Sequence, residues 1–560
     1  MNIKLAICAT LVTATSLCSA QNLALTDYFF DTVVSSLAQP VSIAFPSIDT
    51  QFVCEKNTGK LRVITNGVAV GNAIDLAVTN DGEQGLLGVV LDPGFAQNRF
   101  VYLFYSRAAT DGGAWLDDRL EKFFWNGVSL SFVSTVMVLG PHPDWESPPY
   151  HHGGYIKIGP DGKLYIQRGD MARYGCFEMN NNPTVIGAAA CIYRINLDGS
   201  VPADNPFATH PDASVKRMFL YGFRNGYGMT WDEQTGRMWY TENGPEVYDE
   251  INIGEAGMNS GWRLIMGPDS RNATYVQNNH TSYNSDDLVY LTGAFYRDPE
   301  FSYLSPIGIS GIEFFNSPKY HPNERGDALI LSTNLGRLMK LDLNQARDGF
   351  LLSGGLSDQV ADNPAEVDAI TIGTGWGATT DGRIGPDGYM YVVGYSLGKI
   401  FRIRPKVETI VPASFTMFRG SVLQGNLASL AMSDDNRLEM RPGAVFSNAE
   451  PPIQIILNAT SPFATPSAMS FTLESHASNS NIEQKISLFN YQTAAYEVLD
   501  TRTATTSDST AVVNVTSNAA RFVEAGTRSI RARVSYRARG AVFVYPWKGR
   551  IDLTKWTITR

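Results

Sequence analysis

Three short polar segments each stand directly before a run of apolar residues, and their side chains offer a base, a cation and amides. The segments are Glu83-Gln84-Gly85, His151-His152-Gly153-Gly154 and Phe223-Arg224-Asn225-Gly226. A histidine is mostly neutral near pH 7 yet still basic, so it suits the removal of a proton from a hydroxyl group. An arginine can stabilise negative charge that develops during a reaction. If the three segments occupy equivalent places in a repeated structure, their side chains converge on one site.

Such a repeat is present: an apolar strand, a turn rich in Asp, Gly, Pro or Asn, and a second strand dense in aromatic and β-branched residues. The copies run over 41–54, 86–105, 155–166, 228–240, 311–331 and 382–393. Most continue into a third strand with basic–apolar alternation, at 59–64, 192–195, 336–341 and 398–403. Period-two alternation bounded by turns indicates antiparallel strands. We therefore expect an all-β protein that begins with a six-bladed β-propeller, over residues 21–407.

The character of the chain changes after Arg404-Pro405, where Ser, Thr, Ala and Asn become frequent. Strand-like segments follow at 453–457, 468–473, 484–489, 511–515, 529–534 and 541–545, without a helix signal. This spacing predicts an antiparallel β-sandwich over residues 408–560. Its last forty residues carry ten Arg or Lys but only Glu524 and Asp552 as acids. We interpret these basic residues as a solvated strand face rather than as a grip for an anionic polymer.

Composition and the amino terminus limit the possible partners and location of the protein. The net charge is −10 and the sequence pI is about 5.3, which argues against a dedicated nucleic-acid or anionic-membrane binder. Lys4, the apolar run Leu5–Leu17 and the small residues before Gln21 predict a signal peptide over residues 1–20. No later stretch is apolar enough to span a bilayer, so we expect a secreted or periplasmic protein.

Three cysteines remain after the predicted signal peptide: Cys54, Cys176 and Cys191. Cys176 and Cys191 are close enough in sequence to form a disulfide across a loop in an oxidising compartment. Three buried free thiols are an equal alternative at this stage. None of the cysteines has the spacing of a zinc site.

Several motifs, in one order along the chain, resemble the soluble quinoprotein glucose/sorbosone dehydrogenase family. They include Gly85-Leu-Leu-Gly-Val, Asp92-Pro-Gly-Phe-Ala-Gln-Asn98, His151-His-Gly-Gly, Gly159-Pro-Asp-Gly-Lys-Leu-Tyr165, the run Arg194–Pro206, Phe223-Arg-Asn225 and the run Thr241–Asn252. The resemblance extends from about Gln39 to Arg404 and leaves the predicted sandwich outside. It implies a six-bladed propeller that binds pyrroloquinoline quinone (PQQ) and Ca²⁺ at the mouth of its channel.

The resemblance also implies roles for individual residues around the quinone. His151 would be the general base that takes the hydroxyl proton of a sugar as hydride passes from its anomeric carbon to the quinone. Gln84, Arg224 and Asn225 would contact the quinone, and Arg224 would stabilise the charge on its oxygen. Trp376 is a candidate to stack on the quinone ring.

The calcium ligands are assigned by the same resemblance. Gly244 and Pro245 would give main-chain oxygens to Ca²⁺, a hard cation that takes oxygen ligands. Asp249 and Glu250 would belong to a second, structural calcium site.

The sequence departs from the family pattern at three places. Tyr150 stands before the histidine, where the family has an acidic residue. The segments Ser332–Gly336 and Ala378–Asp381 lack the lysine and the two arginines that hold the quinone carboxylates in the family. Arg168, Arg337 and Arg383 are the candidates to replace them.

The leading hypothesis is therefore an exported, PQQ-dependent oxidation of an aldose or related sugar, with an electron acceptor that the sequence does not identify. The alternative is a cofactor-free propeller that binds a glycan or protein at the cell surface, with the sandwich as an attachment domain. Calcium-dependent hydrolysis of a lactone or ester ranks third, because such sites need several carboxylates around the metal.

Overall fold

The computed structural model describes residues 21–140, 149–172, 180, 189–274, 283–447, 449–540 and 546–560. The predicted signal peptide, Cys176 and the predicted strand at 541–545 lie outside the described residues. The chain divides into two compact units, Met1–Arg404 and Pro405–Arg560. Within the described ranges, no helix combines the length and the apolar character that crossing a membrane requires.

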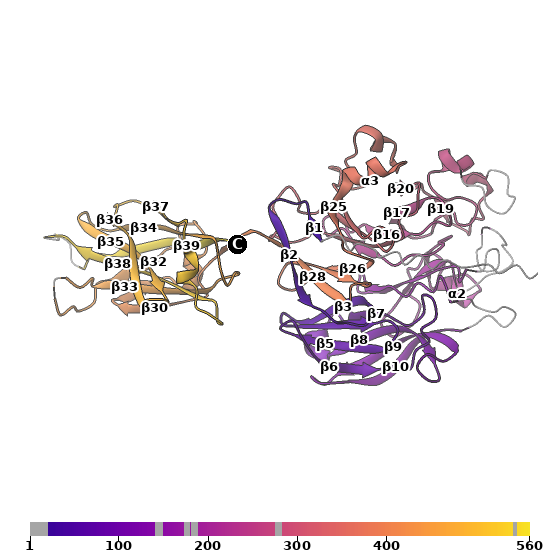
Figure 1. Ribbon diagram of the computed structural model, residues 1–560, viewed down its shortest axis with the longest axis horizontal. Helices are drawn as coiled ribbons and strands as arrows, with labels where there is room; N and C mark the ends of the chain where they lie inside the picture. Colours follow the sequence, from indigo (N-terminus) through magenta and orange to yellow (C-terminus); the bar gives the residue numbers. More distant parts are fainter. Residues whose placement is uncertain are drawn as a thin grey trace, which may run out of the picture. The chain divides into compact units, whose positions relative to one another are not determined.

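The first unit contains six sheets of mainly antiparallel strands, which confirms the six-bladed propeller (Figure 1). The first blade consists of β3 (Pro40–Ser47), β4 (Thr50–Glu55), β5 (Lys60–Thr65) and β6 (Val68–Asp75), and the second of β7 (Leu86–Leu91), β8 (Phe100–Ala108), β9 (Trp115–Trp125) and β10 (Leu130–Leu139). The third blade contains β11 (Ile156–Ile158), β12 (Leu164–Arg168), β13 (Cys191–Ile195) and β14 (Met218–Tyr221), and the fourth contains β15 (Met229–Trp231), β16 (Met238–Glu242), β17 (Asp249–Gly254) and β20 (Phe301–Tyr303). The fifth blade contains β21 (Ile309–Phe314), β22 (Ala328–Ser332), β23 (Arg337–Leu341) and β25 (Thr371–Thr374), and the sixth contains β26 (Thr379–Ile384), β27 (Met390–Gly394) and β28 (Lys399–Pro405). Short strands extend the third blade (β18, Met258–Asn259, and β19, Phe295–Tyr296), the fourth (β24, Val360–Ala361) and the fifth (β1, Asn22–Leu23).

A separate apolar cluster fills the space between each pair of neighbouring blades. Strand β22 shows how one strand serves two of them: Ile330 packs toward the fourth blade, and Leu329 and Leu331 pack toward the sixth. Successive side chains of a strand point to opposite faces, so both faces of an inner strand must be apolar. This explains why the inner strands have nearly continuous apolar sequences.

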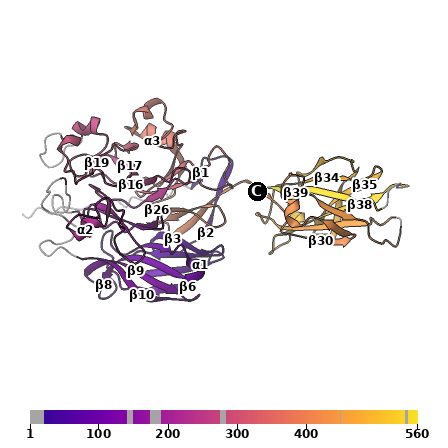
Figure 2. The ribbon, with the colours of Figure 1, turned by 180° about the vertical axis from the view of Figure 1, so that it is seen from behind.

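Strand β2 (Tyr28–Val34) is the outer strand of the sixth blade, in the order β2-β28-β27-β26. This indigo strand therefore lies beside the orange β28, at the other end of the unit's sequence (Figure 1), and Figure 2 shows the same sheet from behind. Asp31 and Arg402 join the two strands through a pair of contacts of 3.0 and 3.2 Å between carboxylate and guanidinium. The ring is closed by pairing the amino-terminal segment with the last blade.

Over the described ranges the α-helices are few and short: α1 (Phe95–Asn98), α2 (Ala213–Lys216) and α3 (Pro364–Ile370). Short 3₁₀ helices cover Asp269–Thr274, Ser285–Asp287, Gly354–Asp358, Leu427–Leu430 and Ala519–Phe522.

The second unit consists of two antiparallel sheets, which confirms the predicted sandwich. One sheet has the order β31-β32-β39-β34-β37 with β29 also on β39, and the other has the order β30-β33-β38-β35-β36. The strands are β29 (Val407–Ile410), β30 (Ser414–Arg419), β31 (Ser421–Gln424), β32 (Leu438–Arg441), β33 (Ile453–Thr460), β34 (Ala468–Ala477), β35 (Ile482–Asn490), β36 (Ala495–Thr503), β37 (Ser509–Val515), β38 (Ser529–Ala538) and β39 (Gly549–Thr559). The sequence pattern missed β39, the central strand of its sheet.

Five of the ten basic residues near the carboxyl end form ion pairs with acidic residues. Arg521 pairs with Glu497, Arg537 and Arg539 pair with Glu483, and Lys548 and Arg550 pair with Glu439. These ion pairs agree with a solvated strand face, because their positive charges are already compensated.

Two of the three mature cysteines can be placed. Cys54 and Cys191 are buried free thiols. Burial raises the pKa of Cys191 to about 12, so this thiol stays protonated and unreactive. Cys176, the other half of the predicted disulfide, lies outside the described residues.

Candidate functional site

A cavity of about 270 Å³ at the propeller axis is lined by residues from all six blades. They are Val41 and Lys56, Gly82, Glu83 and Leu87, Gly153, Tyr227, Ser310 and Thr333, and Thr380 and Tyr395. A second cavity of about 260 Å³ adjoins it and shares Glu83, Tyr227, Ser310 and Thr333. His151, Arg224, Asn225 and Asn243 line this second cavity. The polar segments before β7, β11 and β15 thus do meet at one mouth.

His151 is fixed through both its backbone and its ring. Its backbone N–H donates to Glu83 Oε2 at 2.8 Å, and its Nδ1 contacts Asp170 Oδ1 at 2.5 Å. Because a carboxylate can only accept, this contact places the ring hydrogen on Nδ1 and leaves Nε2 as the basic nitrogen. The side chain lines the cavity although the residue is only 8% exposed.

Asp170 is fully buried and is itself held in place. Trp262 Nε1 donates to its Oδ2 at 2.9 Å, and the backbone N–H of Ala172 donates to its Oδ1 at 2.8 Å. The carboxylate cannot turn away from the imidazole without losing these bonds. The sequence did not single out Asp170, because it follows His151 by nineteen residues outside any recognised motif.

Arg224 and Asn225 each leave a buried polar atom without a protein partner. Arg224 Nη1 donates to the carbonyl oxygen of Asn243 at 2.8 Å, and the guanidinium lies 5.3 Å from the Trp262 ring centre. Among the described residues, Arg224 Nε and Asn225 Oδ1 have no hydrogen-bond partner. Buried polar atoms are nearly always paired, so these atoms favour a ligand or ordered water in the cavity.

Glu83 is a cavity residue that the sequence did not select. Its carboxylate accepts from the backbone of His151 and, at 3.2 Å, from Asn225 Nδ2. It therefore links the second, third and fourth blades at the mouth. The sequence feature that could have identified Glu83 is its position beside Gln84 in the motif before β7.

Gln84 points elsewhere, so its assignment as a quinone contact needs correction. It is 3% exposed, its Nε2 lies 3.0 Å from His152 Nε2, and its Oε1 accepts from Thr79. His152 in turn contacts Asp118, which also pairs with Arg168. Burial alone would raise the pKa of Asp118, but the charges of His152 and Arg168 hold that pKa well below its usual range. Gln84 and His152 are therefore bonded to each other in the protein interior and do not line either mouth cavity.

Trp376 is also placed differently from the sequence-based assignment. Its side chain is fully buried, its Nε1 donates to the carbonyl oxygen of Asn22 at 2.8 Å, and its ring packs on Phe30 and Phe401. A ring enclosed between β1 and β28 cannot stack on a ligand at the mouth. Trp376 instead belongs to the apolar cluster between the fifth and sixth blades.

Gly244 and Pro245 directly follow the cavity residue Asn243. Gly244 lies in a tight turn, since a Cβ there would come within 2.2 Å of the carbonyl oxygen of Val247. Within the part of the chain that the structure describes, no backbone N–H donates to the carbonyl oxygen of Gly244 or Pro245. Both oxygens are therefore available as ligands for a hard cation.

Asp249 and Glu250, the residues of the predicted second calcium site, are buried beside the mouth and already have hydrogen-bond partners. Asp249 accepts from the backbone N–H groups of Gly244, Ile307 and Ile309 at 2.8–3.0 Å, which joins two loops at the mouth. Burial raises the pKa of Asp249 to about 6 and, together with neighbouring acids, that of Glu250 to about 7. The described residues contain no group of three or more His, Cys, Asp or Glu suited to a metal.

The three arginines considered as replacements for the cationic clamp are already paired. Arg168 pairs with Asp118, Arg337 with Asp368, and Arg383 with Asp381. At the clamp positions themselves, Thr333, Asn334 and Thr380 line the mouth. Tyr150 is 51% exposed beside it. None of the three arginines lines either mouth cavity.

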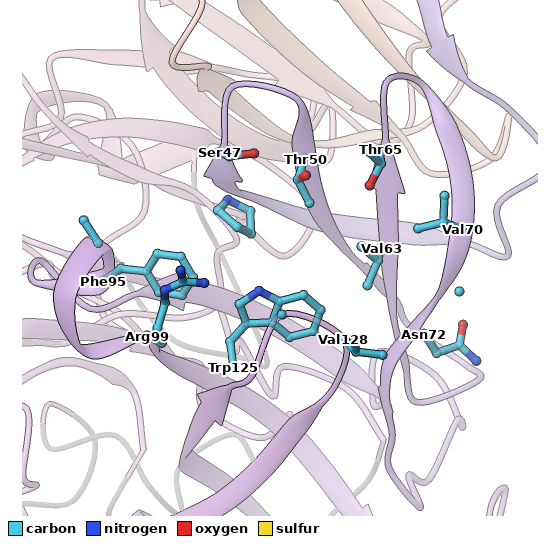
Figure 3. A pocket seen from close by; sticks show the side chains of 14 residues that line it. Ser47, Thr50, Val63, Thr65, Val70, Asn72, Phe95, Arg99, Trp125 and Val128 are labelled. Atoms are coloured by element: carbon cyan, nitrogen blue, oxygen red, sulfur yellow. The ribbon is translucent and has the colours of Figure 1, made fainter.

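A larger cavity, of about 600 Å³, lies elsewhere. It is a groove between the first two blades, near the carboxyl ends of β3 and β7, whereas the mouth lies at the amino ends of these strands. Figure 3 shows its lining from the first blade (Ser47, Thr50 and Thr65) and from the second (Phe95, Arg99 and Trp125). It contains no histidine or carboxylate. Size alone therefore does not identify the candidate active site, whereas the convergence of ionisable groups at the mouth does.

This chain is similar to a known protein family, to relatives in other organisms and to solved structures. A family model described as glucose/sorbosone dehydrogenase matches residues 37–402. The aldose sugar dehydrogenase YliI of Escherichia coli is 28% identical over 345 residues, covering 58% of this chain and 78% of the relative. Quinoprotein glucose dehydrogenase B of Acinetobacter calcoaceticus is 28% identical over 259 residues, covering 42% of this chain and 52% of that protein. The solved apo form of the soluble aldose sugar dehydrogenase of Escherichia coli has the same fold, with a TM-score of 0.51 at 24% identity, over 68% of this chain and 99% of that one.

Proposed function

The chain belongs to the glucose/sorbosone dehydrogenase family, and on this basis we propose that it oxidises an aldose or related sugar at the anomeric carbon, with PQQ as the hydride acceptor. The observation that carries the proposal is the geometry of the mouth. An imidazole oriented by a buried carboxylate and a guanidinium with an unpaired donor line one cavity. Two relatives named for sugar dehydrogenase activity support the same reaction class.

The residues present fit a quinone cofactor with calcium. Arg224 and Asn225 line the cavity, and each has a polar side-chain atom without a protein partner, Nε and Oδ1. The main-chain oxygens of Gly244 and Pro245 are the proposed ligands of Ca²⁺. When bound, the quinone supplies an electrophilic centre that accepts the hydride of the sugar.

The protein's own groups account for the proton. His151 Nε2 accepts the proton of the anomeric hydroxyl group as the C–H bond breaks, and the sugar leaves as a lactone. Asp170 holds the imidazole and stabilises the imidazolium that forms. General base catalysis of this kind contributes about 10²–10⁴-fold to the rate. Arg224 stabilises negative charge that develops in the cavity.

The cellular location is part of the proposal. We infer export by the signal peptide at residues 1–20, followed by action in the periplasm or outside the cell. The amino-terminal sequence of the mature protein tests this, because cleavage predicts Gln21 as its first residue.

The test is dye reduction by purified protein supplied with PQQ, Ca²⁺ and a panel of aldoses. We expect turnover by the wild type and about 10²–10⁴-fold less by His151→Ala. His321→Asn is the matched control, because the His321 side chain is 61% exposed and lies in the loop between β21 and β22, outside both mouth cavities. Absence of both quinone binding at micromolar concentration and turnover in the wild type would reject the proposal.

A cofactor-free propeller that binds a glycan or a protein remains the second candidate. One observation favours it: Thr333, Asn334 and Thr380 stand where the family's cationic clamp is expected. Glycan binding by the wild type, without PQQ binding or dye reduction, would support this candidate.

A further inference from the structure

Lys56 is a nearly buried lysine at the propeller axis that no sequence motif singled out. It follows β4, is 6% exposed, and lines the cavity to which all six blades contribute. Its backbone is held on both sides, by the N–H bond to Gln39 O at 3.1 Å and by the bond from Leu86 N at 2.9 Å to its carbonyl oxygen. The side chain therefore starts from a fixed position at the mouth.

Gly85 makes room for this side chain. A Cβ on Gly85 would lie 2.7 Å from Lys56 Cγ and 2.3 Å from the Lys56 carbonyl oxygen. Gly85 also has a φ of +149°, which L side chains rarely adopt. Position 85 therefore requires a glycine, because a larger residue would collide with the backbone and side chain of Lys56.

The Lys56 ammonium has fewer acceptors than it has donors. Its Nζ donates to Asn57 Oδ1 at 2.7 Å, and among the described residues it forms no ion pair within 4.0 Å. Burial lowers the pKa of Lys56 to about 8, while the charges of Glu83 and Asp81 raise it. An ammonium group carries three donors, so a buried one with a single neutral acceptor is undersatisfied.

The other positive charge at the mouth is Arg224, in the adjoining cavity. Glu83 lines both cavities. The side chains from the fifth and sixth blades, Thr333 and Thr380, are neutral. Among the residues that line this cavity, the cation without a close ion pair is therefore Lys56 on the first blade.

We propose that Lys56 is the anion-binding residue of the mouth and receives a carboxylate of the bound ligand. This inference rests on the proposed function, which makes that ligand either PQQ, with its carboxylates, or an acidic sugar. In either case the carboxylate exchanges water for a charge-assisted bond to Nζ and displaces no protein partner. One such bond corresponds to an affinity ratio of about 10–150-fold.

The experiment compares wild type, Lys56→Met and Lys56→Arg by equilibrium titration of the full chain with Ca²⁺. Two probes are used, PQQ and its trimethyl ester, which lacks the carboxylate charges. We expect Lys56→Met to weaken PQQ binding about 10–150-fold with little effect on the ester, and Lys56→Arg to restore much of the loss. Lys60→Met is the control, since Lys60 lies on β5 of the same blade and pairs loosely with Asp75 at 4.0 Å.

A second arm identifies the source of the carboxylate. If Lys56→Met leaves PQQ affinity unchanged but raises KM about 10-fold or more for a uronic acid and not for the neutral aldose, the acidic sugar is the source. If neither quantity changes while the wild type binds PQQ and turns over sugar, this inference is wrong and the proposed function stands. If the wild type neither binds PQQ nor oxidises any sugar, both are wrong.

The variants are expected to fold. Replacing a buried charge by an apolar side chain of similar length is often neutral or stabilising. Thermal unfolding of each variant checks this, and Lys56→Gln replaces Lys56→Met in both arms if the methionine variant unfolds early.

Discussion

His151 combines an unusual backbone with a tightly held ring. Its φ is +59°, in the left-handed region that most side chains avoid, and the Gly153 and Gly154 that follow also have positive φ. The bond from its N–H to Glu83 and the contact of its ring with Asp170 offset this strain. The ring is thereby presented to the cavity with only Nε2 available for proton transfer.

Replacing Asp170 by Asn tests whether this orientation matters for the reaction. Asn can hold the imidazole with the wrong nitrogen protonated, so we expect kcat to fall about 10²–10⁴-fold. The affinity for PQQ should change less than about threefold, since Asp170 does not line the cavities. Asp198→Asn, in an exposed turn, is the control. Equal loss of PQQ affinity and of kcat would indicate a collapsed site instead.

The lowered pKa of Lys56 gives a pH dependence of a definite sign. Burial brings this pKa to about 8, so the ammonium loses its charge as the pH rises through that value. We expect the affinity for PQQ to fall between about pH 7 and 9 in the wild type and to stay flat in Lys56→Arg, whose guanidinium keeps its charge. Bound anion raises the pKa of Lys56, which moves the midpoint upward. PQQ titrations of both proteins across this pH range test the prediction. Identical pH profiles of PQQ affinity for the wild type and Lys56→Arg would contradict it.

At the scale of elements, the turn signatures of the repeat have a structural cause. Asp161 accepts from the Tyr165 hydroxyl group on the next strand and from Arg194 on the strand after it. Asp387 repeats this arrangement with Tyr391 and Arg402 in the sixth blade. One Asp thus ties a turn to two strands, and this is why Gly-Pro-Asp-Gly turns and basic third strands recur in the sequence.

The repeat was sufficient to predict the blades but not their closure. Strand β2 belongs to the sixth blade, yet it precedes the first copy of the repeat and follows none of its turns. Local pattern cannot show which distant strand a segment pairs with, since that depends on the closed ring. The same limit explains the site: His151 and Arg224 stand in motifs, whereas Asp170 and Lys56 became visible only through contacts. Trp376 was misassigned because a buried aromatic has no sequence mark that separates core from ligand site.

Removal of β2 should therefore cost the propeller more than its length suggests. Deleting residues 21–35 exposes the edge of β28 and the cluster between the fifth and sixth blades. We expect little folded protein, or a Tm lower by about 10 °C or more, because several kcal/mol of apolar burial is lost. Deleting only residues 21–26, which removes β1, is the control and should lower Tm by a few degrees at most. Similar thermal unfolding of both truncations would contradict a closing role for β2.

At the scale of the whole molecule, the two compact units have separate cores and separate sheets. The residues that line the mouth all belong to the first unit. The sandwich has buried residues of its own, among them Phe471 and Trp556. We therefore expect the first unit alone to supply the residues for the proposed binding and oxidation.

Separately produced segments test this division. We expect residues 21–404 to bind PQQ with a Kd within about threefold of that of the full chain, and residues 405–560 to unfold cooperatively on their own. Calorimetry and titration provide the two readouts. Loss of PQQ binding in a folded 21–404 segment would show that the sandwich contributes to the site.

The most direct measurement is the absorbance of bound quinone when a stoichiometric amount of aldose is added without oxygen or dye. We expect the wild type, loaded with PQQ and Ca²⁺, to reduce the quinone in a single turnover. His151→Ala should bind PQQ with a similar Kd yet reduce it about 10²–10⁴-fold more slowly. Equal rates of quinone reduction in the two proteins would contradict the assignment of the mouth as the active site.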